Sequence, residues 1–210
     1  MPNKNFKKLY HKPLFEWTLE TLLSLKAVNK IVINTDAVNK IKRYSIFKNP
    51  KILIRPRPLN LCGDEVSMNK VIANDISNYS SDIYLMTHTT NPFLKKKTLN
   101  AAISLFKRNF IKKKYDSFFS VNKFQSRFYN GKSLPINHDP NNLIPTQQLT
   151  PWFEENSIFY LFTKNSFNKT NARIGKKPML FETDRIESID IDNLDDWYLA
   201  ELIAAGMYNK

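Results

Sequence analysis

The sequence predicts an α/β sandwich built around a largely parallel sheet. Short apolar segments with the composition of strands alternate along the chain with longer segments that carry one apolar face, as helices do. Parallel strands need a crossover connection, usually a helix, so this alternation favours parallel neighbours over hairpins. The length of 210 residues is typical of one domain that buries a substantial core, and we detect no internal repeat.

Residue types at the segment ends define the elements of the first half. Pro13 suits the first turn of a helix, and polar Asp36 follows an apolar strand. Pro56 ends the next strand because it cannot donate to a ladder, and Ser67 can cap a helix. The expected elements are a helix at 13–25, a strand at 30–36, a helix at 37–46, a strand at 51–55, a helix at 67–77 and a strand at 82–86.

The second half continues the same alternation. Leu99, Ile103, Phe106 and Phe110 fall near one stripe of a helix that Thr98 opens. The remaining expected elements are strands at 116–121 and 157–162, a short strand around Asp190, and a closing helix at 195–208.

One segment, Gln125–Glu155, lacks this periodicity and is expected to leave the sheet. Four prolines punctuate it: Pro135, Pro140, Pro145 and Pro151. A stretch of this length inside a single domain is usually functional. We expect an inserted arm over 125–155, exchanged with a second subunit, and keep a mobile loop as the alternative.

Two carboxylates near the carboxyl end predict a metal site. On a strand, Asp190 and Asp192 share one face while Ile189 and Ile191 anchor the other in a core. Two like charges this close favour a cation between them, and Mg²⁺ prefers oxygen ligands. Seven acids gather there in an otherwise basic chain: Glu182, Asp184, Glu187, Asp190, Asp192, Asp195 and Asp196. The alternative is that the pair only caps the following helix and solvates a strand end.

Composition narrows the class of protein. The net charge of +13 comes mostly from scattered Lys, and no aromatic and glycine pattern of an RNA-binding module accompanies it, so we expect no nucleic-acid partner. No apolar run approaches the roughly 20 residues that cross a bilayer, so no membrane association is expected. The single Cys62 excludes an internal disulfide and fits the cytoplasm.

Six motifs in register give the chain a family resemblance. It resembles the N-acylneuraminate cytidylyltransferases, also called CMP-sialic acid synthetases. The matching segments are residues 2–14, Asn34-Thr35-Asp36, Arg57-Pro58 with Leu61, Asp64 and Ser67, the turn at 87–93 with His88, Glu155 to Tyr160, and Ser188-Ile189-Asp190-Ile191-Asp192.

The resemblance implies a Rossmann-like three-layer sandwich of the nucleotide-diphospho-sugar transferase type, with a dimerisation arm, in a homodimer. It implies that CTP joins a sialic-acid-like nonulosonic acid, a 2-keto sugar acid, to give the CMP-sugar and pyrophosphate, for surface polysaccharide or glycan synthesis. Asp190 and Asp192 would hold Mg²⁺, and Lys4 would meet phosphate oxygens. Asn5 and Ser67 would contact the nucleotide. The sugar pocket would contain His88, Thr90, Gln147, Asn156 and Tyr160.

Each role has a simpler alternative. Lys4 could be a solvated lysine, Ser67 only a helix cap, His88 a hydrogen-bonded strand-end residue and Tyr160 a core residue. The sequence also departs from the family pattern. Near Gln147, where relatives carry an Arg that steadies the substrate, it has Pro145 and Thr146.

The start of the chain is the second departure. The family's opening strand and nucleotide loop are absent before Met1-Pro2-Asn3, so we expect 1–210 to be one cytidylyltransferase domain shortened at its amino end. Losing a central strand would leave unpaired backbone groups on two neighbouring strands. A catalytically inactive homologue that binds sugar or nucleotide is therefore the alternative function.

Overall fold

Two sheets form the middle layer of the computed structural model, which describes residues 1–63 and 65–208, so Asp64 lies outside the described residues. In the smaller sheet, β3 (Ile31–Thr35) pairs in parallel with β4 (Ile52–Pro56). The larger sheet has the order β5 (Tyr84–Thr87), β7 (Trp152–Phe162), β6 (Ser117–Phe124) and β8 (Pro178–Glu182). A short antiparallel pair, β1 (Lys8–Leu9) and β2 (Lys12–Pro13), precedes both sheets.

The larger sheet is mixed, because one strand runs against the other three, so the largely parallel sheet that the sequence predicts is interrupted at β7. Strand β7 runs antiparallel to both β5 and β6, whereas β6 and β8 are parallel. The apolar run Ile158–Phe162 of β7 is buried throughout, as a central strand requires. Such a run indicates burial on both faces but carries no signal of strand direction.

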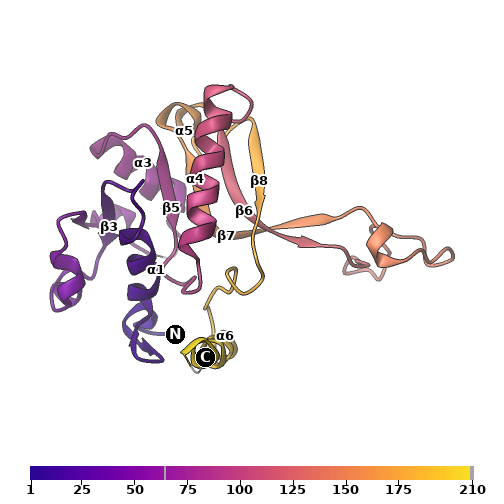
Figure 1. Ribbon diagram of the computed structural model, residues 1–210, viewed down its shortest axis with the longest axis horizontal. Coiled ribbons are helices and arrows are strands. Elements are labelled where there is room, and N and C mark those ends of the chain that lie inside the picture. The colour runs from indigo at the N-terminus through magenta and orange to yellow at the C-terminus, as the bar shows by residue number, and fades with distance from the viewer. Residues whose placement is uncertain (64, 209–210) are drawn as a thin grey trace.

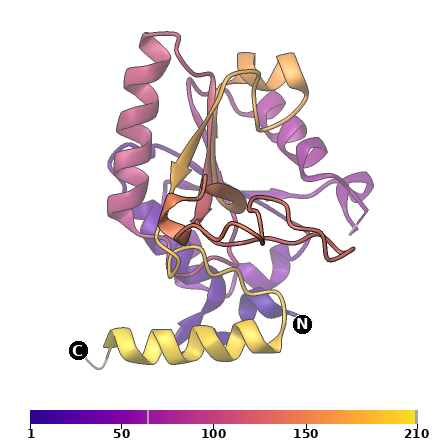
Figure 2. The same cartoon turned by 90° about the vertical axis from the view of Figure 1, so that its right-hand side faces the viewer.

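Helices cover both faces of the larger sheet (Figure 2). On one face, α4 (Lys96–Ile111) packs Leu99 and Phe106 against Phe118 and Leu161. On the other, α3 (Met68–Asn78) and α5 (Lys164–Thr170) pack against Tyr160 and Phe162. In a third cluster, α1 (Leu14–Leu23) covers β3 and β4. These are the three layers that the sequence predicts.

The closing helix lies outside these layers. Helix α6 (Leu194–Tyr208) packs Trp197 and Ala200 against Leu9 and Leu14 near the amino terminus (Figure 1). The remaining elements are short: α2 (Val38–Ile41) and the 3₁₀ helices η1 (Lys4–Phe6), η2 (Ser45–Lys48), η3 (Leu59–Leu61) and η4 (Thr146–Gln148).

Two predicted elements differ from the structure. The helix expected at 37–46 is only the four-residue α2 followed by η2. The segment around Asp190 is not a strand; it runs extended between a turn and α6 and joins no sheet. The sequence analysis also missed α5 and β8.

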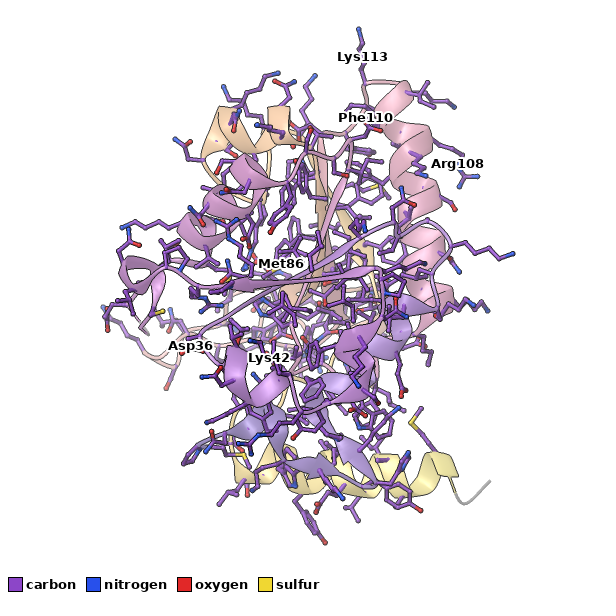
Figure 3. All side chains as sticks on the ribbon, turned by 90° about the vertical axis from the view of Figure 1, so that its left-hand side faces the viewer. Asp36, Lys42, Met86, Arg108, Phe110 and Lys113 are labelled. Atoms are coloured by element: carbon purple, nitrogen blue, oxygen red, sulfur yellow. The ribbon has the colours of Figure 1, made fainter. Side chains whose placement is uncertain are left out.

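A cavity of about 1080 Å³ separates the two sheets. All of β3 and all of β5 line it, with apolar side chains of α1 and α3 above and below. Within the described residues, β3 pairs only with β4 and β5 only with β7, so no strand bridges the cavity. Figure 3 views the molecule from this side and labels Met86 of β5 and Asp36, the residue after β3.

The predicted excursion is a segment that projects far from the body of the molecule (Figure 1). It begins after β6 and ends at residue 151, because Trp152 to Glu155, expected to belong to it, pair with β6 instead. The side chain of Gln125 ties its two ends by donating to the carbonyls of Gln147 (2.8 Å) and Leu149 (3.0 Å). Its exposed apolar residues include Tyr129, Leu134, Ile136, Leu143 and Ile144.

Candidate active site

The acid pair lies on an extended segment that is fixed to the loop after β5. The backbone N–H of Ile191 donates to the carbonyl of Thr90 (3.0 Å), and Asn91 donates to the carbonyl of Ile189 (3.1 Å). Ile191 is fully buried. Ile191 therefore anchors the segment without a strand, while Asp192 beside it is exposed and Asp190 is half-buried.

The two carboxylates have different partners. Asp192 pairs with Lys4 at 2.9 Å, across 188 positions of sequence. The Oδ1 of Asp190 is buried and has no hydrogen-bond partner among the described residues. A buried carboxylate oxygen without a donor is costly unless a ligand satisfies it.

Neither carboxylate caps the following helix. Asn193 accepts from the backbone N–H groups of Asp195 (2.9 Å) and Asp196 (3.0 Å). Asp196 accepts from those of Asp192 (2.9 Å) and Asn193 (3.0 Å). The capping alternative therefore fits Asn193 and Asp196, and leaves Asp190 and the side chain of Asp192 available for another role.

The chemistry of this pair fits Mg²⁺. Within the described part of the chain, no group of three or more His, Cys, Asp and Glu side chains could enclose a metal. Mg²⁺ is commonly held by only one or two carboxylates, together with waters and substrate phosphates. The partnerless Oδ1 of Asp190 is a ready ligand atom, and Asp192 supplies a second carboxylate that already attracts a cation.

The predicted residues His88 and Thr90 lie beside this pair. Burial, followed by the positive charge of Arg173, lowers the pKa of His88, while the charges of Asp190 and Asp192 act in the opposite direction. These influences place one imidazole among a cation and two carboxylates. His88 also lines the cavity, and so does Asn5, which follows Lys4 in the sequence.

Tyr160 is fully buried, and its ring and hydroxyl both have partners. The hydroxyl donates to Glu155 and lies 3.0 Å from the hydroxyl of Ser157. The guanidinium carbon of Arg173 lies 3.9 Å from the centre of its ring. Burial and the bond to Glu155 raise the pKa of Tyr160 to about 12. Tyr160 is therefore a core residue whose ring also packs against the guanidinium of Arg173.

Three other predicted residues are engaged elsewhere. Ser67 is exposed and caps α3 by accepting from the N–H of Asn69 (3.3 Å), as its simpler alternative proposes. The Asn156 amide donates to Asn122 (3.0 Å) and Thr183 (2.9 Å), inside the sheet. Gln147 lies in the projecting segment, which points away from the body of the same chain and therefore from the acid pair.

The sequence analysis missed a polar cluster that lines the cavity near the carboxyl ends of β3 and β4. Arg57 donates to the side chain (2.8 Å) and the carbonyl (3.0 Å) of Asn34, which donates to Asp75 (2.8 Å). Burial is the largest influence on Asp75 and raises its pKa. The position of Asn34 and Arg57 at the ends of neighbouring strands is the signal that could have indicated this cluster.

The comparisons with known proteins agree with one another. The chain matches the family described as Cytidylyltransferase over residues 1–204. It is 24% identical over 220 residues to an N-acylneuraminate cytidylyltransferase of Escherichia coli, covering 94% of this chain and 47% of that protein. It is 24% identical over 201 residues to a two-part Helicobacter pylori protein, named pseudaminic acid cytidylyltransferase and UDP-2,4-diacetamido-2,4,6-trideoxy-beta-L-altropyranose hydrolase, covering 90% and 37%. The chain thus spans less than half the length of these curated relatives.

Solved structures share the fold. A 4-diphosphocytidyl-2C-methyl-D-erythritol synthase from Anaerococcus prevotii superposes with a TM-score of 0.67 at 13% identity, covering 94% of this chain and 88% of that one. A CMP:2-keto-3-deoxy-manno-octonic acid synthetase in complex with CTP superposes with a TM-score of 0.63 at 12% identity, covering 100% and 93%. No helix in the described part of the chain combines the length and apolar character needed to cross a bilayer.

Proposed function

The chain belongs to the cytidylyltransferase family, and on that premise we propose that it joins CTP to a nonulosonic acid and releases pyrophosphate. The observation that carries the proposal is the pairing of Lys4 with Asp192, close to His88 and to Asp190, whose Oδ1 has no hydrogen-bond partner among the described residues. This place suits a triphosphate, because Lys4 supplies positive charge and the two carboxylates are the ligands that we assign to the metal ion.

The residues of this site would act mainly by positioning and charge neutralisation. Phosphoryl transfer needs little covalent participation by the protein. Much of the rate enhancement comes from holding the two reactants in line. Lys4 would meet phosphate oxygens as a point charge. Asp190 and Asp192 would hold Mg²⁺, which when bound offsets the charge of the triphosphate. Asn5 would contact the nucleotide, and His88 and Thr90 the sugar acid.

A sialic-acid-like acceptor is the substrate class that the relatives favour. The two curated relatives are named for N-acylneuraminate and pseudaminic acid, both nonulosonic acids. We place the reaction in the cytoplasm, which suits the free thiol of Cys62, and in the supply of CMP-sugars for surface glycans. A catalytically inactive binder of nucleotide or sugar is the alternative, and Ser67, which caps α3, favours neither function.

Pyrophosphate release with CTP tests the proposal directly. The purified chain is incubated with CTP, Mg²⁺ and one acid at a time: N-acetylneuraminic, pseudaminic or 2-keto-3-deoxy-manno-octonic acid. We expect release with at least one nonulosonic acid and none without an acid. CTP binding, measured by calorimetry, without any release would instead support the inactive binder.

Substitution of the acid pair tests the metal role. Asp192→Asn keeps the side-chain shape but removes a ligand charge, so we expect Mg²⁺-dependent turnover to fall at least about 100-fold with an unchanged unfolding temperature. Asp195→Asn is the matched control, because that exposed carboxylate is only three positions away. Near-normal turnover of Asp192→Asn would remove the pair from the mechanism.

We further propose a homodimer formed through the projecting segment. Its exposed apolar side chains need a partner surface, and Gln147 on it would then reach the sugar pocket of the second copy. Light scattering should give twice the 24.6 kDa chain mass at micromolar concentration. Leu143→Asp should shift it to the monomer, whereas Ile111→Asp, 80% exposed at the end of α4, should not. A monomeric unsubstituted chain would contradict the proposal.

A further inference from the structure

We propose that Arg173 binds the carboxylate of the acceptor sugar acid and so selects acids over neutral sugars, an inference that rests on the proposed function. Three features of Arg173 support this role: the place of its guanidinium, the few acceptors that it meets, and the contacts that hold its loop.

The guanidinium lies beside two of the predicted sugar-binding residues, Tyr160 and His88. It stacks on Tyr160, with 3.9 Å between its central carbon and the ring centre. It is near enough to His88 for its charge to act on that imidazole, as the charge of Asp190 also does. Its backbone N–H donates to Asn69 (3.3 Å), two residues after Ser67.

The donors of Arg173 are not saturated. Its one side-chain hydrogen bond within the described residues goes to Glu155 at 3.4 Å. Well-formed charged N–H···O bonds are about 2.7–2.9 Å long, so this contact is loose. A guanidinium offers five donors in a planar fork that matches a carboxylate in two parallel bonds. The Tyr160 ring covers one face of the planar guanidinium, and the N–H groups along the edge of the guanidinium stay available to a ligand.

The loop that carries Arg173 is held at several points. Asp116 accepts from the backbone N–H groups of Lys176 (3.0 Å) and Lys177 (2.9 Å), and Ser117 accepts from that of Gly175 (2.8 Å). A Cβ at Gly175 would lie 2.3 Å from the Asp116 carboxylate, so only glycine fits this close approach. Because the loop is already held in place, little of its conformational entropy is lost when the guanidinium binds a ligand.

A carboxylate is the anion that this position favours over a phosphate. Lys4, the other cation of the site, is already at the acid pair, where the triphosphate would lie. Arg173 instead accompanies Tyr160 and Glu155, on the side assigned to the sugar. The acceptor class carries one carboxylate, and a bidentate pair with Arg173 would orient the sugar as well as hold it.

Steady-state kinetics with three variants tests the inference. Arg173→Gln should raise KM for N-acetylneuraminic acid about 10- to 100-fold, as expected for losing a charged hydrogen-bond partner, and leave KM for CTP within about twofold. Arg173→Lys should restore part of the loss, because it keeps the charge without the fork. Lys176→Gln, an exposed neighbour in the same loop, should match the unsubstituted chain.

Equilibrium binding separates this inference from the proposed function. Ligand-observed NMR compares N-acetylneuraminic acid with its methyl ester, and the unsubstituted chain should prefer the acid while Arg173→Gln should not. Turnover with an unchanged KM for the acid in Arg173→Gln would overturn the role of Arg173 and leave the proposed function standing. If no acid is turned over, the proposed function fails. An acid preference that is absent from the unsubstituted chain, or that survives in Arg173→Gln, overturns the inference by itself.

Discussion

Single residues of the site combine core packing with polar chemistry, and Tyr160 is the clearest example. Its side chain is fully buried among apolar residues of α3 and α5, yet its hydroxyl donates to Glu155 and its ring supports Arg173. Burial disfavours the phenolate, and the bond to Glu155 opposes loss of the proton. The two readings of Tyr160, as core and as site residue, are therefore compatible.

This environment predicts how stability depends on pH. The pKa of Tyr160 is raised from 10.0 to about 12, so the folded chain holds this proton more tightly than the unfolded one. This difference in pKa adds roughly 2–3 kcal/mol to the free energy of unfolding. The addition is fully present below about pH 10, and it is lost as the pH rises through about 12. Denaturant titrations should therefore show that the free energy of unfolding falls less between pH 9 and 12 in Tyr160→Phe than in the unsubstituted chain.

A matched substitution makes the pH experiment decisive. Tyr198 is 65% exposed on α6, so the free energy of unfolding of Tyr198→Phe should fall between pH 9 and 12 as much as that of the unsubstituted chain. An ultraviolet absorbance titration should show an ionisation near pH 12 that is missing from Tyr160→Phe. Equal alkaline losses in all three proteins would mean that the environment of Tyr160 does not hold its proton.

At this scale the sequence identified the acid pair but not its partners. Asp190 and Asp192 could be found because their spacing and the buried Ile191 form a local pattern. The contact between Lys4 and Asp192 joins positions 188 residues apart, which no local pattern reveals. The contacts of Arg173 with Tyr160 and Glu155 are hidden from sequence patterns for the same reason, since they form only in the folded chain.

Elements of this protein are fixed at their ends by a few side-chain contacts, as the loop between α5 and β8 shows. This loop follows Asn171, which ends α5 with a positive φ of 52°. Thr170 then donates to the carbonyl of Ile174 (3.0 Å), and Asp116 and Ser117 receive the backbone N–H groups that follow. Because β8 starts directly after these contacts, the loop also sets its register beside β6.

Substitution of Gly175 should therefore destabilise the protein. Gly175→Ala places a methyl group 2.3 Å from the Asp116 carboxylate, which anchors the loop. We expect a loss of about 1–3 kcal/mol in the free energy of unfolding, the range for overpacking. Gly131→Ala is the control, because its added Cβ meets nothing within 4 Å. Denaturant titration of both variants measures the difference, and equal stabilities would show that the loop relaxes at no cost.

The elements that were missed depend on pairing rather than on local pattern. Residues 178–182 of β8 alternate exposed and half-buried side chains, so they lack the apolar run that marks a central strand. Pairing with β6 makes them a strand. Around Asp190 the opposite holds: the alternating pattern predicts a strand, but Ile191 donates to the carbonyl of Thr90 in a loop, and the segment joins no sheet of the described chain.

The molecule as a whole has the three layers that alternation predicts, arranged on a mixed sheet in two parts. The number of layers follows from the apolar faces of the helices, which the sequence shows directly. The direction of β7 and the separation of β3 from β5 are set by long-range pairing, and alternation could not specify them. The projecting segment was recognised because proline and the lack of periodicity exclude it from any sheet.

The cavity between β3 and β5 leaves one edge of each strand without backbone partners inside the described chain. Amide protons at such edges depend on local opening, whereas those of β7, flanked on both sides, depend on global unfolding. Amide hydrogen exchange should therefore be fast at the unpaired edges of β3 and β5, and slowest at Ile158–Phe162 of the central strand β7. The smaller sheet with α1 should open as a cooperative unit before the larger one. Equal protection of all strands, lost at one denaturant concentration, would show instead that the two sheets behave as one.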